Sequence, residues 1–589
     1  MRASLESSRA RRPAALTAVV IALGLWLCEA CAKKPRASGP GSSSAVTELP
    51  DLPEPAGVLA ELSITRPDVT FRTVRELGRP FSSLLPAGFP MLTASLLGLP
   101  PLTADSFDPA LPVLGLLLQN GTDAPSWLLA VHTMSGPELV AKLCTGDRAP
   151  FRVLGSASPG LKLLQASAGD AQPSKTAPFL AVFDNYLLIA ESAESLPVAG
   201  PYAARMLPKR PLGEATMALR FSHGALASKL VPTLRGLWAT YRTRLAHQDS
   251  TDRSAHGGRA PDFADPAQVI LGADAVLESL FAVLDGASKL ELDLEPFSDR
   301  LDAALLLEPA AGTEVGAKLA TLTGADAAAL LTLPAETQFA LGVSRTNDER
   351  EAAGKAAGDD WVRLLGARLS ARDAAQLRAV LADWELGRGN QTSYGFLGGG
   401  EPGVFLLTTV ADSVRLKRAG DGFFSLLSLP GVRAPVVEFL GQPRVASSSA
   451  PSDALPNVAR KRLTFAAPAP GKTPVPPLSF AWLVAEQRAF AAAGKNGDAT
   501  LKTLVQAASG AHDTLGSKAG IGESVQRIGQ QAALFAYLDA RLPLAGNGAR
   551  PGSAAPLLLS LGKRAEGAAL RLEISKPALD LALQGALGH

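Results

Sequence analysis

The sequence predicts an α+β protein made of about four irregular repeats, in which antiparallel sheets are covered by helices. Two observations support this fold class. Several short segments alternate apolar and polar residues at period two, which is typical of half-buried strands. Other segments place apolar residues at i, i+3, i+4 and i+7, which is typical of amphipathic helices. We expect each repeat to contain a strand and a helix, followed by a β-hairpin and another helix.

The clearest hairpin lies between residues 290 and 308. From Leu290 to Glu295 leucines alternate with carboxylates, which places the leucines on one side of a strand and the carboxylates on the other. A second strand is expected from Leu301 to Glu308, and a helix begins after it at Thr313. Four other hairpins are expected at Val113–Gln119 with Trp127–His132, Tyr394–Leu397 with Val404–Thr409, Leu557–Leu561 with Ala568–Ile574, and, in a shorter form, Phe179–Phe183 with Tyr186–Ala190.

A single strand that leads into a helix precedes each full hairpin. The four pairs are Val58–Ile64 before Asp68, Met217–Phe221 before Leu226, Phe339–Val343 before Glu349, and Phe480–Val484 before Phe490. A further helix is expected from Ser370, its N-cap, to Gly387. The resulting period of about 100 to 160 residues is too long and too variable for a standard solenoid.

These patterns divide the chain into six segments. We assign residues 1–30 to a signal peptide, 31–54 to a flexible tether, and 55–210, 211–332, 333–470 and 471–589 to four α+β repeats. The tether is rich in Gly, Ser, Pro and Lys, and such a composition buries too little apolar surface to fold. A linker is expected at Gln248–Pro261, where polar and glycine residues are frequent.

The N-terminus has the features of an export signal. Arginines, among them Arg11 and Arg12, precede an apolar run from Ala14 to Leu27. This run is shorter than the roughly 20 residues that span a bilayer as a helix, so a permanent transmembrane anchor is disfavoured.

The five residues from Leu27 to Cys31 resemble the lipobox of bacterial lipoproteins, although Cys28 and Glu29 depart from its usual leucine and small residue. The resemblance implies cleavage before Cys31 and lipidation of Cys31. Because Ala32 and not Asp follows, it also implies sorting to the outer membrane, facing the periplasm. Ala30-Cys31-Ala32 equally resembles an A-x-A cleavage site, so a secreted or soluble periplasmic product is the alternative.

Composition and charge narrow the function classes. Hydrophobic residues make up 47% of the chain, which suffices for a large core, and 57 basic residues nearly balance 55 acidic ones. No stretch combines concentrated positive charge with aromatic residues, so nucleic acid is not an expected partner. Cys144 is the cysteine that remains after Cys28 and Cys31, and we interpret it as a buried structural thiol.

Two glycine-containing motifs resemble nucleotide-binding loops. Gly398, Gly400 and Gly403 have G-x-G-x-x-G spacing, but an extended segment follows where a dinucleotide site needs a helix, so a hairpin turn is the better interpretation. Gly471-Lys472-Thr473 resembles the end of a P-loop, but the neighbouring prolines prevent a helix from starting there. We expect no cofactor at either place.

Two clusters of acidic and histidine residues contain the residue types of metal sites. His247, Asp249, Asp252 and His256 lie within ten residues, and we interpret them as a solvated loop. The carboxylates between Glu291 and Glu295 share a strand face that could bind Ca²⁺, although an exposed sheet face explains them equally well. We expect no metal site and no catalytic residues.

Repetition without visible chemistry favours a non-enzymatic envelope lipoprotein with a binding or structural role at a membrane surface. Its expected partners are the membrane, through the N-terminal lipid, and other envelope proteins. One alternative is a periplasmic carrier or chaperone for apolar ligands, which requires a large apolar groove. A second alternative is a hydrolase whose site is assembled from residues distant in the sequence. By its overall character, the body resembles large exported lipoproteins of bacterial envelopes.

Overall fold

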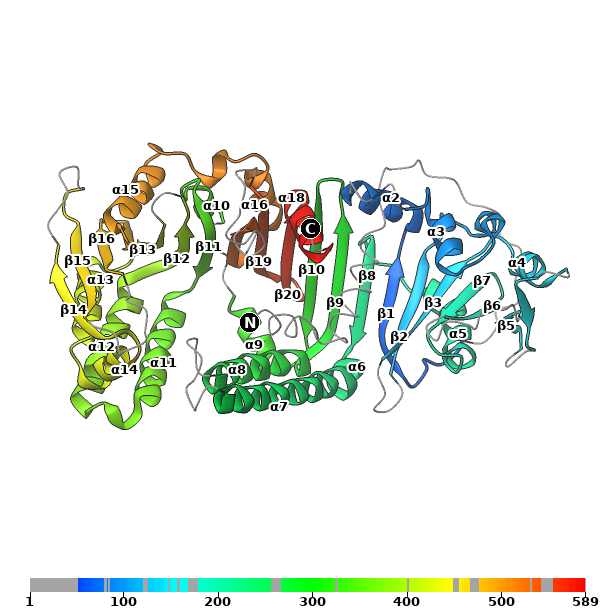
Figure 1. Ribbon diagram of the computed structural model, residues 1–589, viewed down its shortest axis with the longest axis horizontal. Coiled ribbons are helices and arrows are strands. Elements are labelled where there is room, and N and C mark those ends of the chain that lie inside the picture. Colours follow the sequence, from blue (N-terminus) through cyan, green and yellow to red (C-terminus); the bar gives the residue numbers. More distant parts are fainter. Residues whose placement is uncertain are drawn as a thin grey trace, which may run out of the picture. The chain divides into compact units, whose positions relative to one another are not determined.

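The computed structural model of the chain describes residues 51–587 except 79–81, 83–84, 120–124, 147–148, 156–158, 168–177, 256–265, 323, 325–326, 400–401, 449–454, 467–475, 530–531 and 542–553 (Figure 1). The chain divides into two compact units, Met1–Ala317 and Lys318–His589. Both combine helices with antiparallel strands, so the predicted α+β fold class is confirmed. The predicted signal peptide and Cys31 lie outside the described residues.

The first unit contains ten described strands. They are β1 (Val58–Ile64), β2 (Val113–Leu118), β3 (Ser126–His132), β4 (Phe151–Val153), β5 (Leu161–Ala166), β6 (Phe179–Phe183), β7 (Tyr186–Ala190), β8 (Met217–Ser222), β9 (Ala287–Pro296) and β10 (Arg300–Pro309). Its helices are α2 (Pro67–Leu77), α3 (Phe89–Leu96), η2 (Pro101–Ser106), α4 (Gly136–Cys144), α5 (Ser195–Arg205), η3 (Leu207–Lys209), α6 (His223–Ala225), η4 (Leu226–Leu230), α7 (Val231–Ala255) and α8 (Pro266–Asp285), and α9 (Glu314–Ala320) follows β10.

The second unit also contains ten described strands. They are β11 (Thr337–Ser344), β12 (Arg388–Leu397), β13 (Gly403–Val410), β14 (Gln442–Ser447), β15 (Ala459–Ala466), β16 (Leu478–Val484), β17 (Arg488–Gly494), β18 (Ala532–Asp539), β19 (Pro556–Arg564) and β20 (Gly567–Ser575). Its helices are α10 (Ala328–Leu331), α11 (Asn347–Leu365), η5 (Gly366–Arg368), α12 (Ala371–Gly387), α13 (Ser413–Leu426), α14 (Pro430–Leu440), α15 (Gly497–Ala508), η6 (Leu515–Ser517), α16 (Ile521–Ile528) and α18 (Lys576–Leu587).

The two units share one strand order. In the first unit it is β4-β5-β6-β7-β3-β2-β1-β8-β9-β10, with every neighbouring pair antiparallel. In the second unit it is β14-β15-β16-β17-β13-β12-β11-β18-β19-β20, again antiparallel throughout. The second sheet therefore repeats the first strand by strand. The four sequence boundaries at 55, 211, 333 and 471 stay a prediction, with two predicted strand-and-hairpin segments falling in each unit.

The five predicted hairpins are present as β2/β3, β6/β7, β9/β10, β12/β13 and β19/β20. Two other predictions were wrong. The helix expected at Phe490 is strand β17, because its alanines are buried between β13 and β16 and this packing overrides their helix propensity. The linker expected from Gln248 is the end of α7, which continues to Ala255 because its polar residues are compatible with a helix.

Helices pack on both faces of the first unit's sheet. In the first unit α5 packs on one face, where Leu114, Leu128 and Leu188 are buried, and α4 packs on the other, where Leu139 and Leu187 are buried. Helices α7 and α8 lie side by side between β8 and β9 in sequence, and Phe281 of α8 joins the cluster that includes strand β9 (Figure 1). In the second unit the corresponding connection, between β18 and β19, is much shorter.

Candidate functional site

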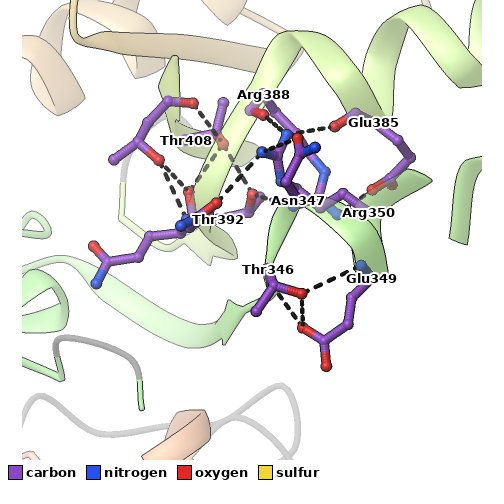
Figure 2. A network of polar contacts seen from close by, with 11 residues as sticks. Thr346, Asn347, Glu349, Arg350, Glu385, Arg388, Thr392 and Thr408 are labelled. Atoms are coloured by element: carbon purple, nitrogen blue, oxygen red, sulfur yellow. Dashed lines mark hydrogen bonds and ion pairs between the residues drawn. The ribbon is translucent and has the colours of Figure 1, made fainter. Parts of the chain in front are cut away.

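A buried polar junction links α11, α12 and β12, and Figure 2 shows its contacts. Helix α12 ends at Gly387, and its last carbonyl groups have no partner within the helix. Arg350 of α11 supplies one, because its Nη1 donates to the carbonyl oxygen of Glu385 at 2.8 Å and also to that of Arg388. A cation at this end of a helix also interacts favourably with the helix dipole.

A second arginine extends the junction into the sheet. Arg388 Nη2 donates to the Glu385 carboxylate, and its Nη1 donates to Thr392 Oγ1 at 2.9 Å. The Thr392 hydroxyl lies 2.9 Å from that of Thr408 on β13. Between Arg388 and Thr392 the pairing of β12 with β13 shifts register, which turns these side chains toward the helices.

Two guanidinium groups are buried in this junction, and the Glu385 carboxylate pairs with one of them, that of Arg388. Arg350 is 3% exposed and Arg388 is 1% exposed. Burial, followed by the positive charge of Arg388, lowers the pKa of Arg350. Among the residues that the structure describes, the Nε atoms of both arginines have no hydrogen-bond partner. These contacts link α11, α12, β12 and β13 to one another, so the junction fixes the α11–α12 pair on the sheet.

The predicted carboxylate face on β9 has protein partners of its own. Glu291 accepts from Arg220 Nε at 2.7 Å and pairs with Lys289 Nζ at 3.0 Å, and Glu295 accepts from the amide of Thr216 at 2.8 Å. Glu291 is 7% exposed, so the expectation of an exposed face was wrong at this residue. The reason is the loop before β8: Arg220 also donates to the Pro211 carbonyl and thereby holds this loop over the strands.

Electrostatics at Glu291 favour the charged carboxylate. Burial raises its pKa, but the hydrogen bonds and charges of Arg220 and Lys289 outweigh burial and leave the pKa lowered. These cations occupy the oxygens that a calcium ion would need. Within the described ranges, no group of three His, Cys, Asp or Glu side chains could hold a metal ion.

The described residues among the remaining sequence candidates lie on different elements. Gly398 and Gly403 flank the β12–β13 turn, whereas Gly400 and the segment 471–473 lie outside the described residues. Residues 247, 249 and 252 lie in α7, and residue 256 is again outside. Cys144 is half-buried at the end of α4, and burial raises the pKa of its thiol, with Lys162 opposing.

The first unit contains the residue types of a hydrolase triad at a short β-bridge between Phe107 and Thr133. His132 Nδ1 lies 3.7 Å from Asp108 Oδ2, which is longer than a hydrogen bond. Ser106 is buried, and its hydroxyl accepts from Lys142 Nζ at 2.9 Å. The serine is therefore engaged by a lysine and not by His132, and the geometry gives no support to nucleophilic catalysis.

An exposed apolar surface lies on α3 and η2. On α3, Leu96 is 66% exposed and Met91 is also exposed. On η2, Leu102 is 80% exposed. We call these three residues the α3–η2 surface. The sequence-based predictions did not include it, although a signal exists: from Pro80 to Ala104 the chain contains no Asp, Glu, Lys or Arg.

A broader apolar surface covers one side of strands β11, β18, β19 and β20. Its central row is Leu341, Ala536, Leu559 and Leu572, which are paired across the four strands. We call the following residues the apolar sheet face: Phe339, Leu341, Val343, Leu534, Ala536, Leu538, Leu557, Leu559, Leu561, Leu570, Leu572 and Ile574. All twelve are half-buried, whereas Phe535, Tyr537 and Leu558 on the opposite side are fully buried.

The equivalent surface of the first unit is better covered. There α2 packs over β9, and α6 and α8 pack on the same strand, so that Met217, Leu290 and Leu294 are buried. In the second unit α11 contacts β12 instead. Helix α18 covers one end of the apolar sheet face, where Leu581 packs near Leu557 and Ile574.

Comparison with known proteins adds a distant structural likeness. No protein-family model matches the chain, and no curated protein sequence matches it. Three crystal forms of TP0453 are similar in structure over 44% of this chain. Form III has 9% identity, covers 97% of TP0453 and has a TM-score of 0.22; for form IV the values are 10%, 96% and 0.21, and for form I they are 9%, 97% and 0.19.

Two further observations concern membranes and cavities. In the part of the chain that the structure describes, no helix is both long and apolar enough to cross a bilayer. A cavity beside Val343, Thr392 and Phe535 has a volume of about 20 Å³. That volume accommodates one water molecule and is far too small for a lipid.

Proposed function

We propose that this chain is a non-enzymatic, lipid-anchored protein of the cell envelope whose first unit binds a membrane surface through α3 and η2. The observation that carries the proposal is the α3–η2 surface itself. A surface helix normally turns polar residues outward, but α3 exposes Met91 and Leu96. Because Pro80–Ala104 contains no charged residue, entry of this segment into the membrane interface requires no charge to leave water.

The predicted lipid anchor would keep the α3–η2 surface close to the membrane. Residues 32–50 of the predicted tether extend at most about 3.6 Å per residue, so they would hold the body within roughly 70 Å of the membrane. The chain joins the first unit at Asp51, which pairs with Lys209 of η3 at 2.8 Å. Helix α3 has eight residues, too few to cross a bilayer, and it therefore suits the interfacial region.

The first experiment removes the anchor and measures binding by the body alone. Purified Cys31→Ser protein is floated with vesicles of phosphatidylethanolamine and phosphatidylglycerol, with and without the double change Leu96→Asp/Leu102→Asp. Burying each leucine contributes about 1.5–3 kcal/mol, so the double variant should bind at least about tenfold more weakly.

Val414→Asp is the matched control, because Val414 is 69% exposed on α13 in the second unit. It should float like the parent protein. Equal flotation of parent and double variant, or equal loss in the control, would refute binding through the α3–η2 surface.

A second experiment tests the address. Intact mass and membrane fractionation of the wild-type protein should show a diacylglyceryl increment on Cys31 and membrane association, and Cys31→Ser should release the protein. A soluble wild-type chain that begins at Lys33 would instead establish cleavage after Ala32 and would remove the anchor from the proposal.

A further inference from the structure

We infer that the apolar sheet face of the second unit binds an acyl chain of an anionic lipid. This inference extends the proposed function by naming a ligand for a site separate from the α3–η2 surface. Its twelve residues are all apolar: eleven are aliphatic, Phe339 is the one aromatic residue among them, and no side chain of the twelve offers a hydrogen bond. Protein interfaces are typically enriched in aromatic residues and arginine, so this composition favours a hydrocarbon partner.

The length of the face, including the end that α18 covers, is close to that of one acyl chain. Leu557 and Leu561 are four residues apart on β19, which corresponds to about 13 Å at 3.3 Å per residue. A bilayer core is about 30 Å thick, so each of its two layers of acyl chains is about 15 Å deep. Four strands at about 4.8 Å spacing give the face a width of roughly 14 Å between its outer strands.

Charge at one end of the face suits an anionic headgroup. Lys563 continues the row of Leu557, Leu559 and Leu561 at the β19–β20 turn, and it is exposed. Arg345 follows Val343 beyond the same end of β11, and it is exposed as well. Lys563 Nζ also donates to the carbonyl oxygen of Ala320, which leaves its positive charge available to an anion. A chain lying along the strands therefore places its headgroup next to two cations.

Comparison of the two units supports an open face. The first unit, with the same strand order, covers the equivalent strands with α2, α6 and α8. In the second unit α11 lies on β12, and the junction of Arg350 and Arg388 fixes it there. All twelve residues of the apolar sheet face are half-buried, whereas five of their twelve equivalents in the first unit are buried: Ala60, Ile64, Met217, Leu290 and Leu294.

The test measures binding in solution without vesicles, so its outcome is separate from membrane binding by α3 and η2. Cys31→Ser protein is titrated with dansylated undecanoic acid, and the probe is displaced with alkyl phosphates of ten to fourteen carbons and with dodecanol. We expect affinity to rise about fourfold per methylene group. The double variant Arg345→Gln/Lys563→Gln should bind dodecyl phosphate more weakly than the parent protein and should bind dodecanol equally well.

Ala536→Trp places a ring in the centre of the face and should abolish probe binding. If the face is open, Ala536→Trp should have the same unfolding temperature as the parent protein. Ala340→Trp changes a fully buried alanine on β11 and should lower the unfolding temperature strongly. Three results would each overturn the inference. The first is a large fall in the unfolding temperature of Ala536→Trp, and the second is an affinity for alkyl phosphates that does not depend on their chain length. The third is a parent protein that binds no probe but forms a dimer, with Ala536→Trp preventing the dimer. Failure of the vesicle experiment alone would leave this result intact.

Discussion

Replacing Arg350 by methionine tests whether the polar junction holds the α11–α12 pair in place. Methionine keeps much of the apolar length of the side chain and removes the guanidinium. The carbonyl groups of Glu385 and Arg388 then lose their donor inside the protein. A buried acceptor without a partner costs about 1–3 kcal/mol. With two such acceptors the cost is about 2–6 kcal/mol. Relief of the repulsion between Arg350 and Arg388 offsets part of it, so we expect the free energy of unfolding of this region to fall by about 3 kcal/mol.

The measurement must resolve one region, because a chain of two units does not unfold in a single step. Hydrogen exchange followed by mass spectrometry in increasing urea reports on peptides from α11 and α12 separately from the rest. Arg378→Met is the matched control: this α12 residue pairs with Asp359 at 2.8 Å at the surface, and such a pair contributes about 0–1 kcal/mol. If Arg350→Met destabilises these peptides no more than Arg378→Met does, the junction does not anchor the helices.

Two pH-dependence predictions concern the first unit. Burial opposes the charged form of Glu291, but Arg220 and Lys289 favour it, and the pKa of Glu291 in the folded state is lowered. The charged carboxylate therefore stabilises the fold above the unfolded-state pKa of about 4.3, and this stabilisation is lost as pH falls through the folded-state pKa. Glu291→Gln should flatten the decline of the unfolding temperature between about pH 5 and 3. Burial lowers the pKa of His132, with Asp108 opposing, so below about pH 6.5 the unfolded chain binds more protons and stability falls. His132→Gln should unfold at nearly the same temperature at about pH 7.5 and pH 5.5, and a wild-type temperature that does not change over this range would contradict the argument.

Local sequence signals predicted the hairpins well. Alternation in β9 and the turn residues between β2 and β3 depend on neighbouring residues alone, and both hairpins are present. Strand β18 was not predicted, because residues Ala532–Leu538 are apolar at every position and show no period-two alternation of apolar and polar residues. The fourth single strand was assigned instead to β16, so the shared ten-strand order of the two units was not recognised.

The candidate surfaces depend on contacts that a sequence does not display. Leu557–Leu561 is apolar on nearly every position, and periodicity cannot tell which side of such a strand remains open. The openness follows from the position of α11 on β12, which Arg350 and Arg388 establish from positions 38 residues apart. The α3–η2 surface differs in this respect, because the absence of charge from Pro80 to Ala104 is visible in the sequence.

The strand order also determines when each unit can fold. In both sheets the first strand of the unit is central: β1 pairs with β2 and with β8, so that Ile64 lies opposite Met217. Such distant pairing raises contact order and slows folding. During synthesis or passage across a membrane, one edge of β1 stays unpaired until β8, which ends at Ser222, has emerged. One edge of β11 likewise stays unpaired until β18, which ends at Asp539, has emerged. A chain truncated between β7 and β8 would expose the edge of its central strand and should aggregate.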